Sequence, residues 1–91
     1  MRGMALALVT AWFGAFATPA AATEQICPLV PSENWMAMSA AEQIGRDLGY
    51  DVAFVQPDGG CWTVYGRKDG VQFEIFLNPQ TGEVVRVERG S

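Results

Sequence analysis

The chain has 91 residues with ten acidic and six basic side chains, and it contains no histidine. A chain of this length holds at most one domain. Without histidine, neither Ser-His-Asp nor Cys-His catalysis is possible, and histidine metal sites are excluded as well. The net charge of −4 disfavours nucleic acid and anionic membrane surfaces as partners, because like charges repel.

We predict that residues 1–22 are a secretory signal peptide. Arg2 gives a positive start, and residues 4–16 are almost wholly apolar. Pro19 then interrupts any helix, and residues 20–22 form a small-x-small cleavage site. The alternative is a retained membrane anchor, but the apolar run is shorter than the roughly 20 residues that a span needs. We therefore expect a periplasmic or secreted protein that keeps no stable membrane span after cleavage.

Residues 23–34 are predicted to be an extended lead-in, because they contain two prolines and no periodic pattern. They include Cys27, one of two cysteines in the chain; the other is Cys61. An even cysteine count in an exported chain favours a Cys27–Cys61 disulfide, which would contribute roughly 3–4 kcal/mol. Two reduced, buried thiols are the alternative. A lipoprotein anchor at Cys27 is disfavoured, because Glu24 and Gln25 do not resemble a lipobox.

Residues 35–91 are predicted to form the folded domain, which begins with a helix over residues 39–48. Ser39 and Glu42 have the spacing of a capping box at its start. Gly49 suits a left-handed C-cap at its end. Four residues at helical spacing are expected on the buried face: Ala41, Ile44, Gly45 and Leu48. The glycine among them indicates a close approach to the sheet, since it costs about 1 kcal/mol in a helix interior.

The pattern of residues 61–77 predicts a β-hairpin with a well-specified register. Asp69 and Gly70 supply the two positive-φ residues of a type I′ turn. Pairing Lys68 with Val71 across that turn then places five apolar side chains on one buried face: Trp62, Val64, Phe73, Ile75 and Leu77. Gly66 is expected to leave room for the Phe73 ring.

Two further strands complete the predicted sheet. Residues 51–56 alternate, with Val52 and Phe54 facing one way, and residues 57–60 form a turn into the hairpin. After a turn at residues 78–82, a last strand follows. The order of one helix and then four strands predicts an α+β fold, with the helix packed on a four-stranded antiparallel meander.

The same register places a second set of side chains on the opposite face of the sheet: Cys61, Thr63, Tyr65 and Phe76. A bond from Cys27 would draw the lead-in across this face, so that Ile26 or Leu29 covers Phe76. If the face stays open, Thr63, Tyr65 and Phe76 are the candidate partner-binding residues. An exposed sheet edge that takes up an extended segment by strand addition is the other candidate surface.

The residues do not indicate an enzyme, a cofactor or a metal site. No glycine-rich phosphate loop precedes the helix, and both cysteines are best used in a bridge. The acidic residues Asp58 and Asp69 lie in predicted turns, where Asp is favoured for structural reasons.

Four segments resemble the PepSY domain family, which is named for the propeptides of secreted metallopeptidases and for a spore-cortex protein. They are Leu48-Gly49-Tyr50, Asp58-Gly59-Gly60-Cys61-Trp62-Thr63-Val64, Asp69-Gly70-Val71-Gln72-Phe73-Glu74-Ile75 and Asn78-Pro79-Gln80-Thr81-Gly82-Glu83-Val84-Val85. The resemblance covers residues 35–87, and its closing Pro-x-Thr-Gly-Glu-Val-Val segment is the most specific part. Asn78 stands where family members often have Asp, which weakens any cation role for that position.

The resemblance implies a small exported binding module that restrains peptidase activity in or near the cell envelope. Its partner would be an envelope peptidase or another exported protein. Two alternatives stay open: a non-inhibitory factor for the assembly or stability of an envelope protein, and a sensor of small ligands or metals that uses the acidic turns.

Overall fold

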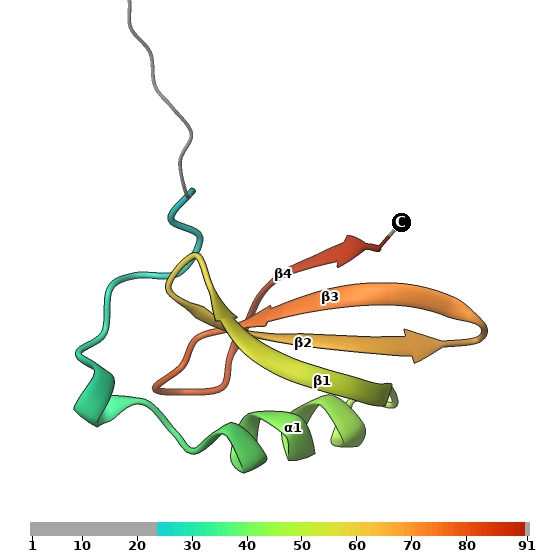
Figure 1. The fold of residues 1–91 in the computed structure, drawn as a ribbon, viewed down its shortest axis with the longest axis horizontal. Helices are drawn as coiled ribbons and strands as arrows, with labels where there is room; N and C mark the ends of the chain where they lie inside the picture. Colours follow the sequence, from blue (N-terminus) through green and yellow to red (C-terminus); the bar gives the residue numbers. More distant parts are fainter. Residues whose placement is uncertain (1–23, 91) are drawn as a thin grey trace, which may run out of the picture.

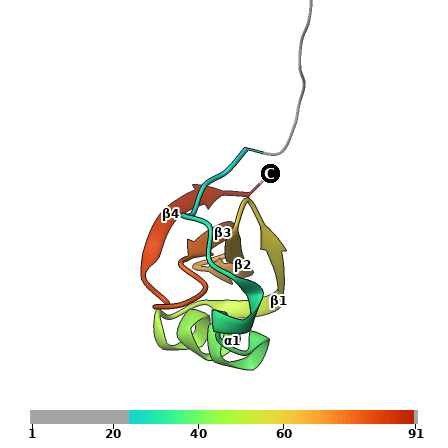
Figure 2. The same ribbon diagram turned by 90° about the vertical axis from the view of Figure 1, so that its left-hand side faces the viewer.

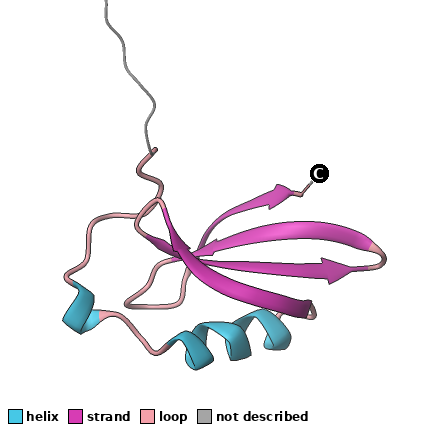
Figure 3. Ribbon diagram, viewed as in Figure 1, coloured by secondary structure: helices cyan, strands magenta, loops and turns pink. Residues whose placement is uncertain are grey.

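The computed structural model describes residues 24–90, so the predicted signal peptide lies outside the described residues. The elements follow in chain order: the 3-10 helix η1 (Ser32–Asn34), α1 (Met38–Asp47), β1 (Asp51–Asp58), β2 (Cys61–Lys68), β3 (Val71–Leu77) and β4 (Val84–Arg89). The four strands form one antiparallel sheet in the order β1-β2-β3-β4, with α1 on one face (Figures 1 and 3). The predicted α+β meander with a single α-helix is confirmed over these residues.

The central hairpin has the predicted register. Lys68 pairs with Val71 across the turn, and Val64 pairs with Ile75 further along the two strands. Asp69 and Gly70 adopt φ values of 53° and 79°, as a type I′ turn requires. The alternation of side chains along β2 and β3 therefore divides the sheet into an inner face toward α1 and an outer face.

The inner face of the sheet holds the main core. Val64, Ile75 and Leu77 are fully buried there, and Trp62 and Phe73 pack against them. The expected close approach of the helix is present at Gly45, where a Cβ atom would lie 2.8 Å from Cγ1 of Val64.

The start of α1 differs from the prediction. Ala37 is the N-cap residue and no side chain caps the helix, so Ser39 lies inside the first turn. Glu42 pairs with Arg46 along the helix instead of reaching back to Ser39. The reason is a contact distant in sequence: the Met36 N–H donates to the Pro79 carbonyl (2.8 Å), which ties the chain to the turn between β3 and β4 just before the helix.

The end of α1 is as predicted, although one residue of its expected buried face is exposed. Gly49 closes the helix with a φ of 99°. Leu48 is the C-cap residue and is 41% exposed.

β1 is longer than predicted and contains a β-bulge at Ala53. The bulge shifts the alternation, so Val52 and Val55 face α1 while Phe54 pairs with Tyr65 on the outer face. Phe54 is consequently 51% exposed, and the prediction that it shares a face with Val52 is wrong. Pairing continues to the end of β1, and only Gly59 and Gly60 remain as the loop to β2.

Gly66 meets the backbone of β1 rather than the Phe73 ring. A Cβ atom at this position would lie 3.0 Å from the Asp51 carbonyl oxygen and 3.1 Å from the Tyr50 Cβ. The Phe73 ring instead packs edge-on against the Tyr50 ring, with 5.7 Å between the ring centroids. The glycine therefore allows a close approach of two neighbouring chain segments.

Candidate functional site

The last strand, β4, forms one edge of the sheet, and its outer side carries backbone groups that no other residue among 24–90 pairs with. The Gly90 N–H donates to the Gln72 carbonyl of β3 (2.8 Å). Because backbone groups alternate in an antiparallel ladder, the even-numbered residues from Arg86 onward face β3. Val87 and Arg89 therefore direct their N–H and C=O groups away from the sheet. We call this side of the strand the β4 edge, and it is a template for adding another strand.

The opposite edge of the sheet, β1, is less suited to strand addition. The bulge between Val52 and Phe54 breaks the regular spacing of its backbone groups. Pro57 near its end has no N–H to donate. β4 also has a register shift, at Val85, but its residues from Arg86 onward pair regularly with β3. An added strand would therefore pair more regularly with this part of β4 than with β1.

The inner face of β4 carries exposed valines. Helix α1 packs on β1 and β2 and leaves the β4 end of this face uncovered (Figures 1 and 2). Val84, Val85 and Val87 are 40%, 42% and 46% exposed, respectively. These three residues form the valine patch. An apolar patch beside an unpaired strand edge is a typical protein-binding surface.

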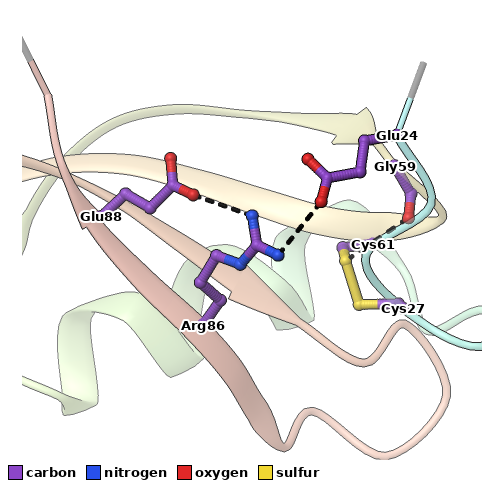
Figure 4. A network of polar contacts seen from close by, with 6 residues as sticks. All are labelled: Glu24, Cys27, Gly59, Cys61, Arg86 and Glu88. Atoms are coloured by element: carbon purple, nitrogen blue, oxygen red, sulfur yellow. Dashed lines mark hydrogen bonds and ion pairs between the residues drawn. A yellow bond between two sulfur atoms is a disulfide. The ribbon is translucent and has the colours of Figure 1, made fainter. Parts of the chain in front are cut away.

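The outer face of β4 carries a small ionic network, shown in Figure 4. Nη1 of Arg86 lies 2.9 Å from Oε2 of Glu88, and Nη2 lies 3.4 Å from Oε2 of Glu24 in the lead-in. The hydrogen bond to Glu88 is the main cause that raises the pKa of Arg86 above its ordinary value. β4 therefore carries charged side chains of alternating sign on its outer face and exposed valines on its inner face.

The disulfide links the lead-in to the sheet. Cys27 and Cys61 are bonded with 5.3 Å between their Cα atoms, and both residues are buried. The backbone N–H groups of Ile26 and Cys27 also donate to the Gly59 carbonyl, at 2.8 and 3.0 Å. The lead-in thus crosses one end of the sheet between β4 and β1 (Figure 2).

Two of the three residues predicted as a partner-binding face are buried. Phe76 is 2% exposed and packs with the disulfide and Ile26, and Thr63, which pairs with Phe76 across the two strands, is fully buried. Leu29, the other residue expected to cover Phe76, is 78% exposed and points elsewhere. Of the three predicted residues, only Tyr65 remains partly exposed and can contact a partner.

Tyr65 lies in a shallow trough at the other end of the outer face. Its ring stacks on Phe54, with 4.5 Å between centroids. The trough has a volume of about 300 Å³, and Ala53, Arg67, Glu74 and Gly90 contribute to its walls. Burial, followed by the negative charges of Glu74 and Asp58, raises the pKa of the Tyr65 hydroxyl.

A second, more open cleft lies beside the start of α1. Trp35 packs edge-on against Trp62, with 5.1 Å between centroids, and Met36 and Met38 continue the apolar lining. Both indole N–H groups are satisfied within the fold: Trp35 donates to the Val30 carbonyl and Trp62 to the Met36 carbonyl. These two tryptophan side chains therefore close one end of the hydrophobic core.

Within residues 24–90, no three histidine, cysteine, aspartate or glutamate side chains come together in a group able to hold a metal ion.

No helix of the part of the chain that the structure describes is both long and apolar enough to cross a bilayer.

The valine patch was not identified from the sequence, although part of its signal is present there. An α-helix is about 10–12 Å across with its side chains, whereas four strands at about 4.8 Å spacing extend further than that. A single helix therefore cannot cover all four strands, and the strand most distant from it keeps apolar residues in contact with solvent. Which strand that is depends on where the helix lies, and this follows only from the three-dimensional structure.

Comparison with known families identifies the chain. Residues 4–88 match the profile of PepSY_2, described as the peptidase propeptide and YPEB domain. No curated protein and no solved structure matches the sequence significantly. Since the family match spans nearly the whole chain, this protein belongs to the PepSY family of peptidase propeptide and YPEB domains.

Proposed function

We propose that this chain is an exported, non-catalytic PepSY module that binds an extended segment of another protein along the β4 edge. The bound segment adds a fifth strand, and its apolar side chains cover the valine patch. Where the target is a peptidase of the cell envelope, binding restrains its activity. The disulfide fits this location, because disulfides persist in oxidising compartments outside the cytosol.

The combination of open backbone groups and exposed valines on β4 is the observation that carries this proposal. Backbone hydrogen bonds supply affinity in strand addition, and pockets or patches for alternate side chains supply specificity. Val87 contributes to both affinity and specificity, since its N–H and C=O face the open edge and its side chain is 46% exposed.

The proposal is tested by photo-crosslinking in the exported protein. A photoreactive side chain at Val87 is expected to capture the target, whereas the same group at Phe54 is the matched control on an exposed site away from β4. With the probe kept at Val87, Arg89→Pro is expected to weaken capture strongly without unfolding the domain, because the N–H that proline removes faces the open edge and does not pair with β3. Equal capture from both probe positions, or capture at Val87 that Arg89→Pro leaves unaffected, would show that the β4 edge is not the binding site.

A role in assembly or stability without inhibition uses the same edge. The captured protein distinguishes the two roles. If it is a peptidase, its hydrolysis rate is measured with and without the purified exported chain at micromolar concentration. An unchanged rate would leave the module as a docking or assembly factor.

A further inference from the structure

We propose that β4 also pairs with β4 of a second copy of this chain, which forms a symmetric dimer whose sheet is continuous across both copies. This goes beyond the proposed function, because the occupant is the protein itself. A target segment and a second copy would use the same edge and therefore exclude each other.

The backbone of β4 is complementary to itself about a two-fold axis through Val87. Val87 turns both its N–H and its C=O toward the open edge. Two copies related by this axis can exchange both hydrogen bonds between their Val87 residues, as an antiparallel hydrogen-bonded pair does. The regular pairing in this register spans Arg86, Val87 and Glu88, because β4 has a register shift at Val85. Such an interface is isologous and closed, since the same patch serves on both sides.

The side chains on the outer face match in this register. Arg86 of each copy lies opposite Glu88 of the other, in the non-hydrogen-bonded pairs where side chains approach most closely. Within one copy these two side chains already lie 2.9 Å apart (Figure 4). The dimer would therefore join two ion pairs into a cluster of four charges with alternating sign. An axis through Arg86 or through Glu88 would place like charges opposite each other instead.

The inner face gains apolar burial in the same register. Val87 packs beside Val87 of the second copy, and Val85 extends the contact. Both residues are more than 40% exposed in the single chain. Helix α1 does not obstruct the approach, since it packs on β1 and β2.

The experiment combines charge reversal with mixing of variants. Arg86→Glu alone, or Glu88→Arg alone, turns both cross-copy attractions into repulsions. Each variant is expected to raise the dissociation constant of the dimer about tenfold or more, measured by sedimentation velocity over a concentration series.

An equimolar mixture of the two variants is expected to restore dimers. In a mixed dimer the introduced glutamate of one copy faces the introduced arginine of the other, and the two unchanged residues, Arg86 and Glu88, face each other as well. Every cross-copy pair is then attractive again. The double variant R86E/E88R is expected to dimerise like the original chain.

Arg89→Glu is the matched control, because it changes the net charge as Arg86→Glu does but its side chain lies on the inner face of the sheet, away from Glu88. It should neither weaken the dimer comparably nor be rescued by Glu88→Arg. Circular dichroism of every variant verifies the fold, and rescue on mixing itself requires both variants to be folded. A chain that stays monomeric at millimolar concentration would overturn the proposal, as would a mixture no more dimeric than its parts. Neither result affects target capture at Val87, so the proposed function is judged separately.

Discussion

Removal of the disulfide should destabilise the domain more than truncation of any single side chain of the lead-in. The bond joins Cys27 to Cys61 across a sequence separation of 34 residues. Closing a loop of this size restricts the unfolded chain by about 4 kcal/mol in the chain-entropy model. The total stability of a domain this small is roughly 3–10 kcal/mol. The double variant C27A/C61A is therefore expected to lose about half of its free energy of unfolding or more.

The assay is urea and thermal unfolding followed by circular dichroism. A loss of about 4 kcal/mol corresponds to a fall in Tm of roughly 15–30 °C for a domain of this size. Reducing agent should lower the Tm of the original chain by a similar amount and leave the double variant unchanged. A difference below about 1 kcal/mol would refute the reasoning. It would show that the remaining contacts hold the lead-in in place without the bond.

Two truncations in the lead-in form a matched pair that tests the same region. Ile26 packs against the disulfide and Phe76, whereas Leu29 is 78% exposed. Ile26→Ala is expected to cost about 1–2 kcal/mol, and Leu29→Ala less than about 0.5 kcal/mol. Equal costs would mean that the lead-in does not lie on the outer face as described.

Three further predictions concern the fold. Gly45→Ala should lower the free energy of unfolding by about 1 kcal/mol, because the new methyl would lie 2.8 Å from the Val64 side chain. The cost of this overpacking exceeds the gain in helix propensity. A variant more stable than the original chain would contradict this prediction. Asn78→Ala should cost about 1–2 kcal/mol in urea unfolding, since the Asn78 side-chain oxygen accepts hydrogen bonds from the Gln80 and Thr81 N–H groups at 2.8 and 3.0 Å; an unchanged midpoint would argue against this turn. Burial raises the pKa of the Tyr65 hydroxyl in the folded state, so the folded state favours the protonated hydroxyl. The stabilisation that this gives to the fold is fully present below the unfolded pKa of about 10, and it is lost as the pH rises through the folded pKa. Stability should therefore fall more steeply above pH 10 in the original chain than in Tyr65→Phe, and parallel pH curves would contradict this.

The features predicted correctly from the sequence are those that depend on residues close together in the chain. The register of the central hairpin follows from Asp69 and Gly70 together with period-2 alternation, and both signals are local. The C-terminus of α1 follows likewise from Gly49. In these places the local conformational preferences and the hydrophobic pattern agree, so tertiary contacts had no competing preference to override.

The errors arose where contacts distant in sequence decide the structure. The N-terminus of α1 is determined by the hydrogen bond from Met36 to Pro79, which overrides the capping-box spacing of Ser39. The bulge at Ala53 reverses the face of Phe54, and one inserted residue leaves little trace in composition. The candidate partner face was left open in the sequence because its exposure depends on the path of the lead-in. The structure buries Phe76 beneath that segment.

Residue-resolved amide hydrogen exchange of β4 tests the central claim most directly. In dilute samples, the amides of Val87 and Arg89 should exchange rapidly, because they face the open edge, while those of Glu88 and Gly90 should be protected by β3. Addition of the captured target, or concentration of the chain itself, should slow exchange at Val87 and Arg89 selectively. Strong protection of these two amides in the dilute chain would contradict the claim, because it would mean that the β4 edge is already covered. Unchanged fast exchange after binding would mean that partners dock elsewhere.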